Sequence, residues 1–233
     1  MQTSSERRLK MTPKKNPENE LVTRAYQVKL ETRDDENGES VVEGRPIVFG
    51  EYADIGGWFR ETIDRGALDE TDLTDVRLCL NHDTGFVYAR SRRNNPSSTM
   101  QLMTDPNGLT FKASLDTKNS PKARDLFTAI QRGDLDKMSF MFSVKEDRWE
   151  DLESDYPTRH ITKIGTVVEV SAVTFPAYEA TSIDARGKEA LESARSAVET
   201  ARQARSTEVE TSDELQLAKA KLNFLIQTGG KTS

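Results

Sequence analysis

A single strand-like segment constrains the fold of this chain more than any other. Residues 167–175, VVEVSAVTF, place apolar side chains on both alternating faces of a strand, with Val173 on one face and Val170 on the other. Because neither face suits water, we expect this strand in the middle of a β-sheet. The carboxylate of Glu169 is then buried, which is costly unless the group is paired. The partner of Glu169 would be an imidazolium, which indicates a catalytic role, or a buried arginine, which indicates a structural role.

A second strand-like segment carries a serine in an unusual place. Residues 138–144, MSFMFSV, alternate with a period of two and follow the turn signal Gly133-Asp134. Ser139 lies near the start of this strand, between a methionine and a phenylalanine. It is either a hydroxyl that fills space or a nucleophile.

Composition divides the chain into three regions. Residues 1–24 are polar and lack the apolar stretch of a secretory signal, so we expect a disordered arm. Residues 25–183 hold most of the aromatic residues, glycines and prolines. Residues 184–233 are rich in Ala, Glu, Arg and Lys, which predicts a helical tail. No apolar run approaches the length of a membrane-spanning helix.

The middle region predicts a mostly β domain. The tetrapeptide DPNG signals a hairpin, Gly44 a bulge, and Ser120 with Pro121 the start of a helix that ends at Gly133. Strands are expected at residues 26–31, 40–50, 76–83, 99–103, 108–115, 138–144 and 167–175. Because alternating βαβ units are lacking, this is an α+β pattern with an antiparallel sheet or barrel.

Charge and cysteine content argue against several classes of function. The net charge of −6 disfavours general nucleic-acid binding. Cys79 is the single cysteine, so it cannot form an internal disulfide, and it suits a reducing cytoplasm. With only two histidines beside it, a structural zinc site is not expected.

His82 is the residue best suited to activate a serine. It follows a strand in which Leu78 and Leu80 share one face, and the alternation predicts that its imidazole points to that apolar face. An isolated histidine in such a place is otherwise a core residue with a satisfied hydrogen bond. Cys79 lies on the opposite face, so a Cys79–His82 nucleophile pair is not expected.

Three residues on three expected strands suggest one catalytic arrangement. A serine hydroxyl needs a general base within hydrogen-bond reach, a task that histidine performs in many enzymes. A carboxylate on the far ring nitrogen fixes the tautomer and stabilises the imidazolium. Ser139, His82 and Glu169 supply these parts. No G-x-S-x-G elbow is present, which disfavours an α/β-hydrolase.

Five segments, in sequence order, resemble the prohead maturation proteases of tailed phages, the caudovirus prohead serine protease family. The segments are VEGRPIVFGEY, RETIDRGALDE, LCLNHD, GLTFKASLDT with the following run to RGDLDKMSFMF, and VVEVSAVTFPAY. The resemblance spans residues 25–183. It departs from the family pattern at Leu68, where an aromatic residue is usual, and at Tyr88-Ala89-Arg90 beside the histidine.

The resemblance implies a fold similar to the herpesvirus assembly protease, an antiparallel β-barrel surrounded by helices. It implies a serine endopeptidase with His82, Ser139 and Glu169 as the triad, needing no cofactor. The enzyme would cleave capsid or scaffold proteins and also its own chain. It would act inside the immature phage shell, in the bacterial cytoplasm. In the herpesvirus relative the third member is a second histidine. Here His160 lies among polar residues, so we expect it at the surface.

Two other functions stay open, and the first of them depends on the tail. A catalytically inert assembly scaffold would use small residues at heptad-like spacing for a helix–helix contact, although an ordinary exposed helix gives the same pattern. These residues are Ala190, Ala194, Ala197, Ala201 and Ala204. A capping box at residues 211–214 precedes an apolar stripe that predicts docking or self-association. A hydrolase of small esters is disfavoured by the missing elbow motif.

Overall fold

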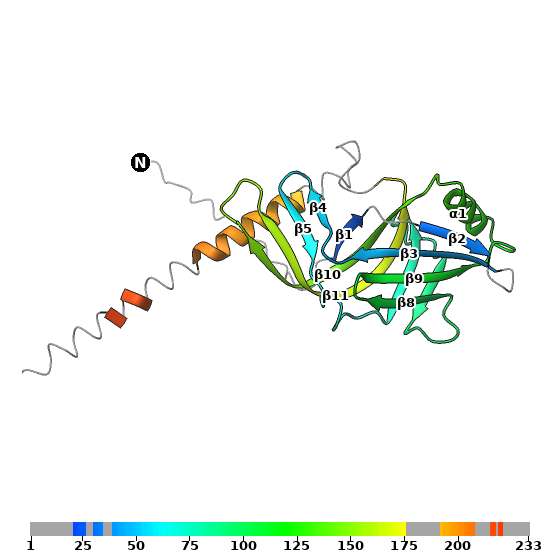
Figure 1. Ribbon diagram of the computed structural model, residues 1–233, viewed down its shortest axis with the longest axis horizontal. Helices are drawn as coiled ribbons and strands as arrows, with labels where there is room; N and C mark the ends of the chain where they lie inside the picture. The colour runs from blue at the N-terminus through cyan, green and yellow to red at the C-terminus, as the bar shows by residue number, and fades with distance from the viewer. Residues whose placement is uncertain are drawn as a thin grey trace, which may run out of the picture.

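The computed structural model of this chain describes residues 21–26, 30–34, 39–175, 192–207, 215–217 and 219–220. Within those residues the strands form a seven-stranded and a four-stranded sheet (Figure 1). The larger sheet has the order β1-β10-β11-β5-β4, and β6 with β7 joins it through β11. Its strands are β1 (Leu21–Tyr26), β4 (Tyr52–Ile55), β5 (Phe59–Ile63), β6 (Asp75–Leu80), β7 (Ala89–Arg92), β10 (Lys137–Glu150) and β11 (Thr158–Val173).

The smaller sheet has the order β2-β3-β9-β8, and it confirms the hairpin expected at DPNG. Its strands are β2 (Leu30–Asp34), β3 (Ser40–Val48), β8 (Met100–Asp105) and β9 (Gly108–Leu115). The pairing of β3 with β9 shifts register after Gly44, where a bulge was expected. A Cβ at Gly44 would lie 2.8 Å from the Met138 sulfur of β10, so the two sheets approach closely there.

The expected helix is present and begins as the sequence indicates. Helix α1 (Pro121–Gln131) has Ser120 at its N-cap, where the side chain accepts a hydrogen bond from the Ala123 N–H at 3.2 Å. Its apolar face, which includes Leu126 and Ile130, is buried in the main hydrophobic core. That core lies between the two sheets and contains the stacked pair Phe140 and Phe142, whose ring centroids are 4.7 Å apart.

The expectation of an antiparallel barrel is only partly met. The fold is mostly β with few helices, but the two sheets are separate and do not close into a barrel within the described residues. Strand β11 pairs antiparallel with β10 on one side and parallel with both β5 and β6 on the other. Strand β11 has sixteen residues, so β5 pairs with its first part and β6 with its last part.

Strands β10 and β11 form a hairpin that is longer than expected. The polar residues 146–159, whose sequence indicates the solvated end of a hairpin, are partly in strands: β10 continues to Glu150, and β11 already begins at Thr158. Four register shifts interrupt the pairing between Met141 and Asp147. These irregularities separate the half of the hairpin that contains Ser139 from the half near its tip.

The helix over residues 192–207 packs against the larger sheet, at the end away from α1 (Figure 1). Ala194 and Val198 are buried against Ile55 and Phe59 of the β4–β5 hairpin. The guanidinium of Arg202 donates to the carbonyls of residues 152 and 154 at 3.0 and 2.8 Å. The observed contact is therefore helix on sheet, and the described part of the apolar stripe near residue 215 is exposed.

One buried ion-pair cluster connects β1, β5 and β11. Glu61 is fully buried and accepts hydrogen bonds from Arg24, whose Nη2 lies 3.0 Å from Oε2, and from Arg159, whose Nη1 lies 3.2 Å from the same oxygen. Burial alone raises the pKa of Glu61, but the two guanidiniums outweigh it, so the pKa lies below its ordinary value of 4.5. This contribution to stability is present above pH 4.5 and is lost as the pH falls through the lowered pKa.

Replacing Glu61 should destabilise the fold far more than breaking an ion pair at the surface. Glu61→Gln removes the anion that the buried Arg24 binds, while the half-buried Arg159 keeps its second partner Asp147, and we expect a loss of roughly 3–5 kcal/mol in the free energy of unfolding. The control is Asp105→Asn, which breaks the solvent-accessible Arg45–Asp105 pair and should cost much less. Urea unfolding at pH 7 measures both, and equal losses would contradict a structural role for the cluster.

Candidate functional site

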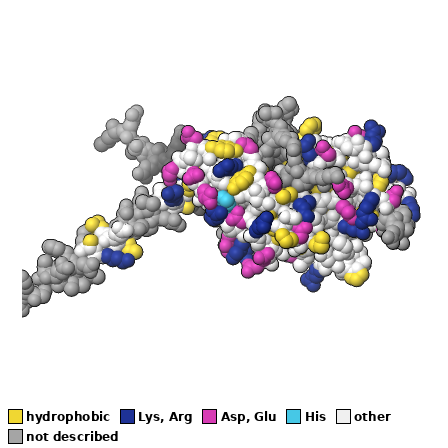
Figure 2. Space-filling view, in the orientation of Figure 1, with side chains coloured by type: hydrophobic (Ala, Val, Ile, Leu, Met, Phe, Trp, Pro, Cys, Tyr) yellow, Lys and Arg dark blue, Asp and Glu magenta, His cyan; other side chains and the backbone are white. Residues whose placement is uncertain are grey.

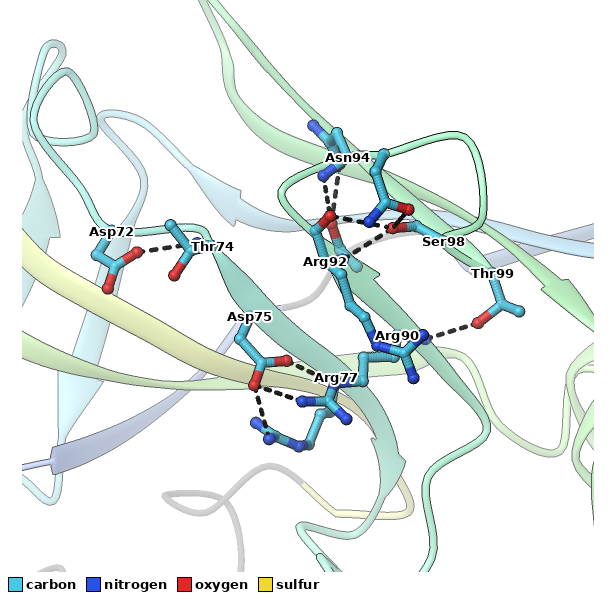
Figure 3. Close-up of polar contacts among 11 residues, drawn as sticks. Asp72, Thr74, Asp75, Arg77, Arg90, Arg92, Asn94, Ser98 and Thr99 are labelled. Atoms are coloured by element: carbon cyan, nitrogen blue, oxygen red, sulfur yellow. Dashed lines mark hydrogen bonds and ion pairs between the residues drawn. The ribbon is translucent and has the colours of Figure 1, made fainter.

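The strand that leads to His82 is held at its start by a small polar network (Figure 3). The Asp75 carboxylate accepts hydrogen bonds from Arg90 at 2.6 and 2.7 Å and from Arg77 at 2.8 Å. The hydrogen bond from Arg90 is the largest cause of the lowered pKa of Asp75. The network joins β6 to its neighbour β7, so the end of β6 has a defined direction.

His82 leaves the strand in a way that simple alternation does not predict. Strand β6 ends at Leu80, and Asn81 and His82 both have positive φ, 51° and 59°. The Asn81 N–H donates to the Ala172 carbonyl at 2.9 Å, which fixes this turn to the end of β11. The expectation that His82 shares the apolar face of Leu78 is therefore wrong, because two left-handed residues redirect its side chain.

The redirected imidazole forms a contact with the buried carboxylate of β11. His82 Nδ1 pairs with Glu169 Oε1, and Glu169 is only 2% exposed, as expected from its strand. The second oxygen of Glu169 accepts a hydrogen bond from the Ser171 hydroxyl at 2.6 Å. A carboxylate at Nδ1 favours the tautomer with the proton on that nitrogen, which leaves Nε2 able to accept a proton.

Ser139 lies one strand away from this pair. It is directly opposite Ser171 in the β10–β11 pairing, so the two side chains share a face of the sheet. The Ser139 hydroxyl is 1% exposed and donates to the Arg24 carbonyl of β1 at 2.9 Å. Among the described residues no hydrogen bond joins Ser139 to His82. The structure thus brings His82 and Glu169 into contact and places Ser139 on the neighbouring strand.

Comparison with known proteins identifies the family of this chain. The model of the caudovirus prohead serine protease family matches residues 27–195. The chain belongs to that family. Among curated proteins none matches it. A solved structure, that of the bacteriophage T4 capsid assembly protease gp21, is similar over 67% of this chain and 98% of its own, with 15% identity and a TM-score of 0.42.

Ser171 is a site residue that the sequence analysis missed. Its hydroxyl donates to Glu169 and accepts the backbone N–H of His82 at 3.2 Å, so it contacts both members of the pair. A hydroxyl with these two contacts fixes the position of His82 relative to the Glu169 carboxylate. The sequence could have indicated this contact, because Ser171 follows Glu169 by two residues and therefore shares its face of the strand.

His160 is buried, so its expected place at the surface is wrong. It is 6% exposed, and its Nδ1 lies 2.9 Å from both Asp64 Oδ1 and Arg148 Nη2. It precedes Glu169 by nine residues in the same strand, which corresponds to roughly 30 Å. The arrangement with a second histidine, as in the herpesvirus relative, therefore has no support here.

Basic and acidic side chains are interspersed over the face shown in Figure 2. No helix in the described part of the chain is long and apolar enough to span a membrane. No group of three or more His, Cys, Asp or Glu side chains within the same residues is arranged to hold a metal ion.

Cys79 lies beside the site but should be chemically inert. It is opposite Ser171 in the β6–β11 pairing, and burial, followed by the charge of Glu169, raises the pKa of its thiol to about 12. At pH 9 only about a thousandth of such a thiol is ionised, and only the thiolate is alkylated. Iodoacetamide at pH 9 should therefore modify the folded chain at least about 10²-fold more slowly than the chain in urea.

The matched control for this measurement is an exposed thiol in the same fold. Met103 is 63% exposed, so Met103→Cys combined with Cys79→Ala supplies it. The control should react at similar rates with and without urea. Rapid alkylation of Cys79 in the native chain would contradict the burial of the thiol beside Glu169.

Proposed function

We propose that this member of the family is a serine endopeptidase with Ser139 as nucleophile, His82 as general base and Glu169 as the orienting carboxylate. The observation that carries the proposal is the contact between the half-buried His82 and the buried Glu169, next to the Ser139–Ser171 row of the sheet. The imidazole has its Nδ1 occupied by the carboxylate, and its other nitrogen is the one needed by a serine. The substrates would be capsid or scaffold proteins, cleaved inside the immature phage shell in the bacterial cytoplasm.

The reaction would proceed by acyl transfer. Ser139 Oγ attacks the scissile carbonyl carbon as His82 takes the hydroxyl proton, and the peptide C–N bond breaks when His82 gives that proton to the leaving amine. Water then attacks the acyl-enzyme, with His82 acting as base a second time. Backbone N–H groups would stabilise the oxyanion. The segment 174–178 is a candidate source of these N–H groups, and it lies mostly outside the described residues.

A catalytically inert scaffold is the second candidate, since the family assignment alone does not establish turnover. The tail helix gave that candidate its support, but its buried residues contact the β4–β5 hairpin of the same chain. The polar groups around Glu169 favour the enzyme. A scaffold has no need of a buried carboxylate aimed at a histidine ring, and such a pair is costly to bury.

Alanine at Ser139 should abolish cleavage and leave the fold intact. His82→Ala should be equally severe, whereas Glu169→Gln should reduce the rate by about 10²- to 10⁴-fold, because it orients the base without reacting. The measurement is co-expression with the cognate major capsid protein, followed by intact-mass analysis of that protein.

Ser143→Ala is the matched control for Ser139→Ala. Ser143 is also a buried serine of β10, on the same face, and its hydroxyl accepts the Thr166 N–H at 3.2 Å. It should leave capsid-protein processing at the wild-type level. Normal processing by the Ser139 variant would refute the mechanism and favour the scaffold.

We further propose that the tail, residues 184–233, mediates packaging and self-association, and that the active enzyme removes part of it. Because the helix over residues 192–207 covers Ile55 and Phe59, a cut before residue 185 would also expose this small apolar cluster of the β4–β5 hairpin. A chain that ends at Thr207 keeps this helix, so it isolates the role of the last residues.

The chain ending at Thr207 should retain cleavage of a capsid-derived peptide in solution. The amount of protease recovered in purified shells, measured by quantitative mass spectrometry against capsid protein, should fall severalfold. Equal amounts of the shortened and full-length proteases in shells would contradict a packaging role for residues beyond 207.

A further inference from the structure

The first described strand is attached to the sheet at the place where Ser139 lies. Strand β1 pairs antiparallel with residues 138–143 of β10, and Ala25 is directly opposite Ser139. The family model begins at residue 27, so β1 precedes the matched domain. In the sheet order β1 is the terminal strand, and without it this part of β10 would be an open edge. An open edge strand is a template for pairing with an extended peptide.

Strand β1 also covers the hydroxyl on which the proposed reaction depends. Ser139 is 1% exposed, and its Oγ donates to the Arg24 carbonyl oxygen at 2.9 Å. A nucleophilic hydroxyl must instead present its oxygen to a carbonyl carbon and its proton to a base. In this state the proton of Ser139 is directed at the backbone of β1, and a substrate cannot take the same position.

A buried anchor holds β1 in this place. The Arg24 side chain is 5% exposed, and both its Nε and its Nη2 bind the carboxylate of Glu61 in β5. Arg24 is opposite Phe140, so its side chain leaves the strand on the face away from Ser139. The strand is therefore held by backbone pairing along its length, by an ion pair on one face and by Ser139 on the other.

We propose that β1 is a built-in occupant of the substrate position, which keeps Ser139 blocked until a substrate segment replaces it as an extended strand along β10. The inference rests on the proposed function, because it requires Ser139 to be the nucleophile. A tethered strand competes at an effective concentration in the millimolar range, so a dilute substrate displaces it poorly. Inside a shell the substrate is concentrated, and the block is then overcome.

A reversible cross-link between β1 and β10 tests this directly in the full-length chain. Thr23 is directly opposite Met141, and such antiparallel partners have the Cα separation of a disulfide. In Thr23→Cys/Met141→Cys the oxidised form should be labelled at Ser139 by a fluorophosphonate probe about tenfold or more slowly than the reduced form. The two variants that carry only one of the new cysteines beside the buried Cys79 should be labelled equally fast in the oxidised and reduced forms.

Each outcome separates the inference from the proposed function. Equal labelling of the oxidised and reduced forms would overturn the block by β1 but leave Ser139 as the nucleophile. Absence of labelling at Ser139 in both forms, with the chain folded, would overturn both. Failure of the two cysteines to form a disulfide, measured by thiol titration, would contradict the pairing of β1 with β10 and with it the block.

A second variant weakens the anchor without a cross-link. Arg24→Gln/Glu61→Gln removes the charges of both partners together and avoids an uncompensated carboxylate at the anchor. It should increase the rate of fluorophosphonate labelling severalfold over the wild type. The matched control, Arg33→Gln/Glu43→Gln, removes an exposed pair between β2 and β3 and should leave the rate unchanged. An unchanged rate in the Arg24 variant, with its circular dichroism spectrum native, would also overturn the block.

Discussion

Strand β11 is the constraint on which the rest of this structure depends. Its last part, residues 167–173, is apolar on both faces, so other chain segments must cover both faces and both edges there. Strand β10 pairs along one edge, and β5 and β6 divide the other between them. The one carboxylate near its end, Glu169, can be accommodated only where a partner is available. The turn after β6 places that partner, His82, beside Glu169. Strand β11 therefore both organises the sheet and determines where the candidate site lies.

Local signals made much of this fold predictable. The N-cap Ser120 and Pro121 define the start of α1, and the DPNG turn defines the β8–β9 hairpin, because each depends on the backbone preferences of a few adjacent residues. Burial of Glu169 followed from the apolar residues on either side of it in the same strand. Candidate site residues could be named from chemistry and family resemblance, and two of the three are in contact.

Features that depend on distant segments could not be predicted in this way. The direction of His82 is decided by two left-handed residues that are fixed to the end of β11, and His160 is buried because Asp64 and Arg148 pack around it. The polar residues 146–150 are typical of the solvated end of a hairpin, but pairing with β11 keeps them within a strand. Parallel pairing of β11 with two strands likewise requires contacts far apart in the sequence, and these replaced the expected barrel.

The terminal position of β1 has a consequence for solubility. In the sheet it forms the border next to β10, and Phe140 and Phe142 of that strand belong to the buried core. A long uncovered border would let two copies join edge to edge and grow into aggregates, which proteins avoid by covering or charging their outer strands. Strand β1 covers part of the edge of the fourteen-residue β10 and presents a border of only six residues in its place. If β1 dissociated alone, the edge of β10 would be exposed to pairing with other copies. Replacement of β1 by a substrate strand in one step avoids that exposure.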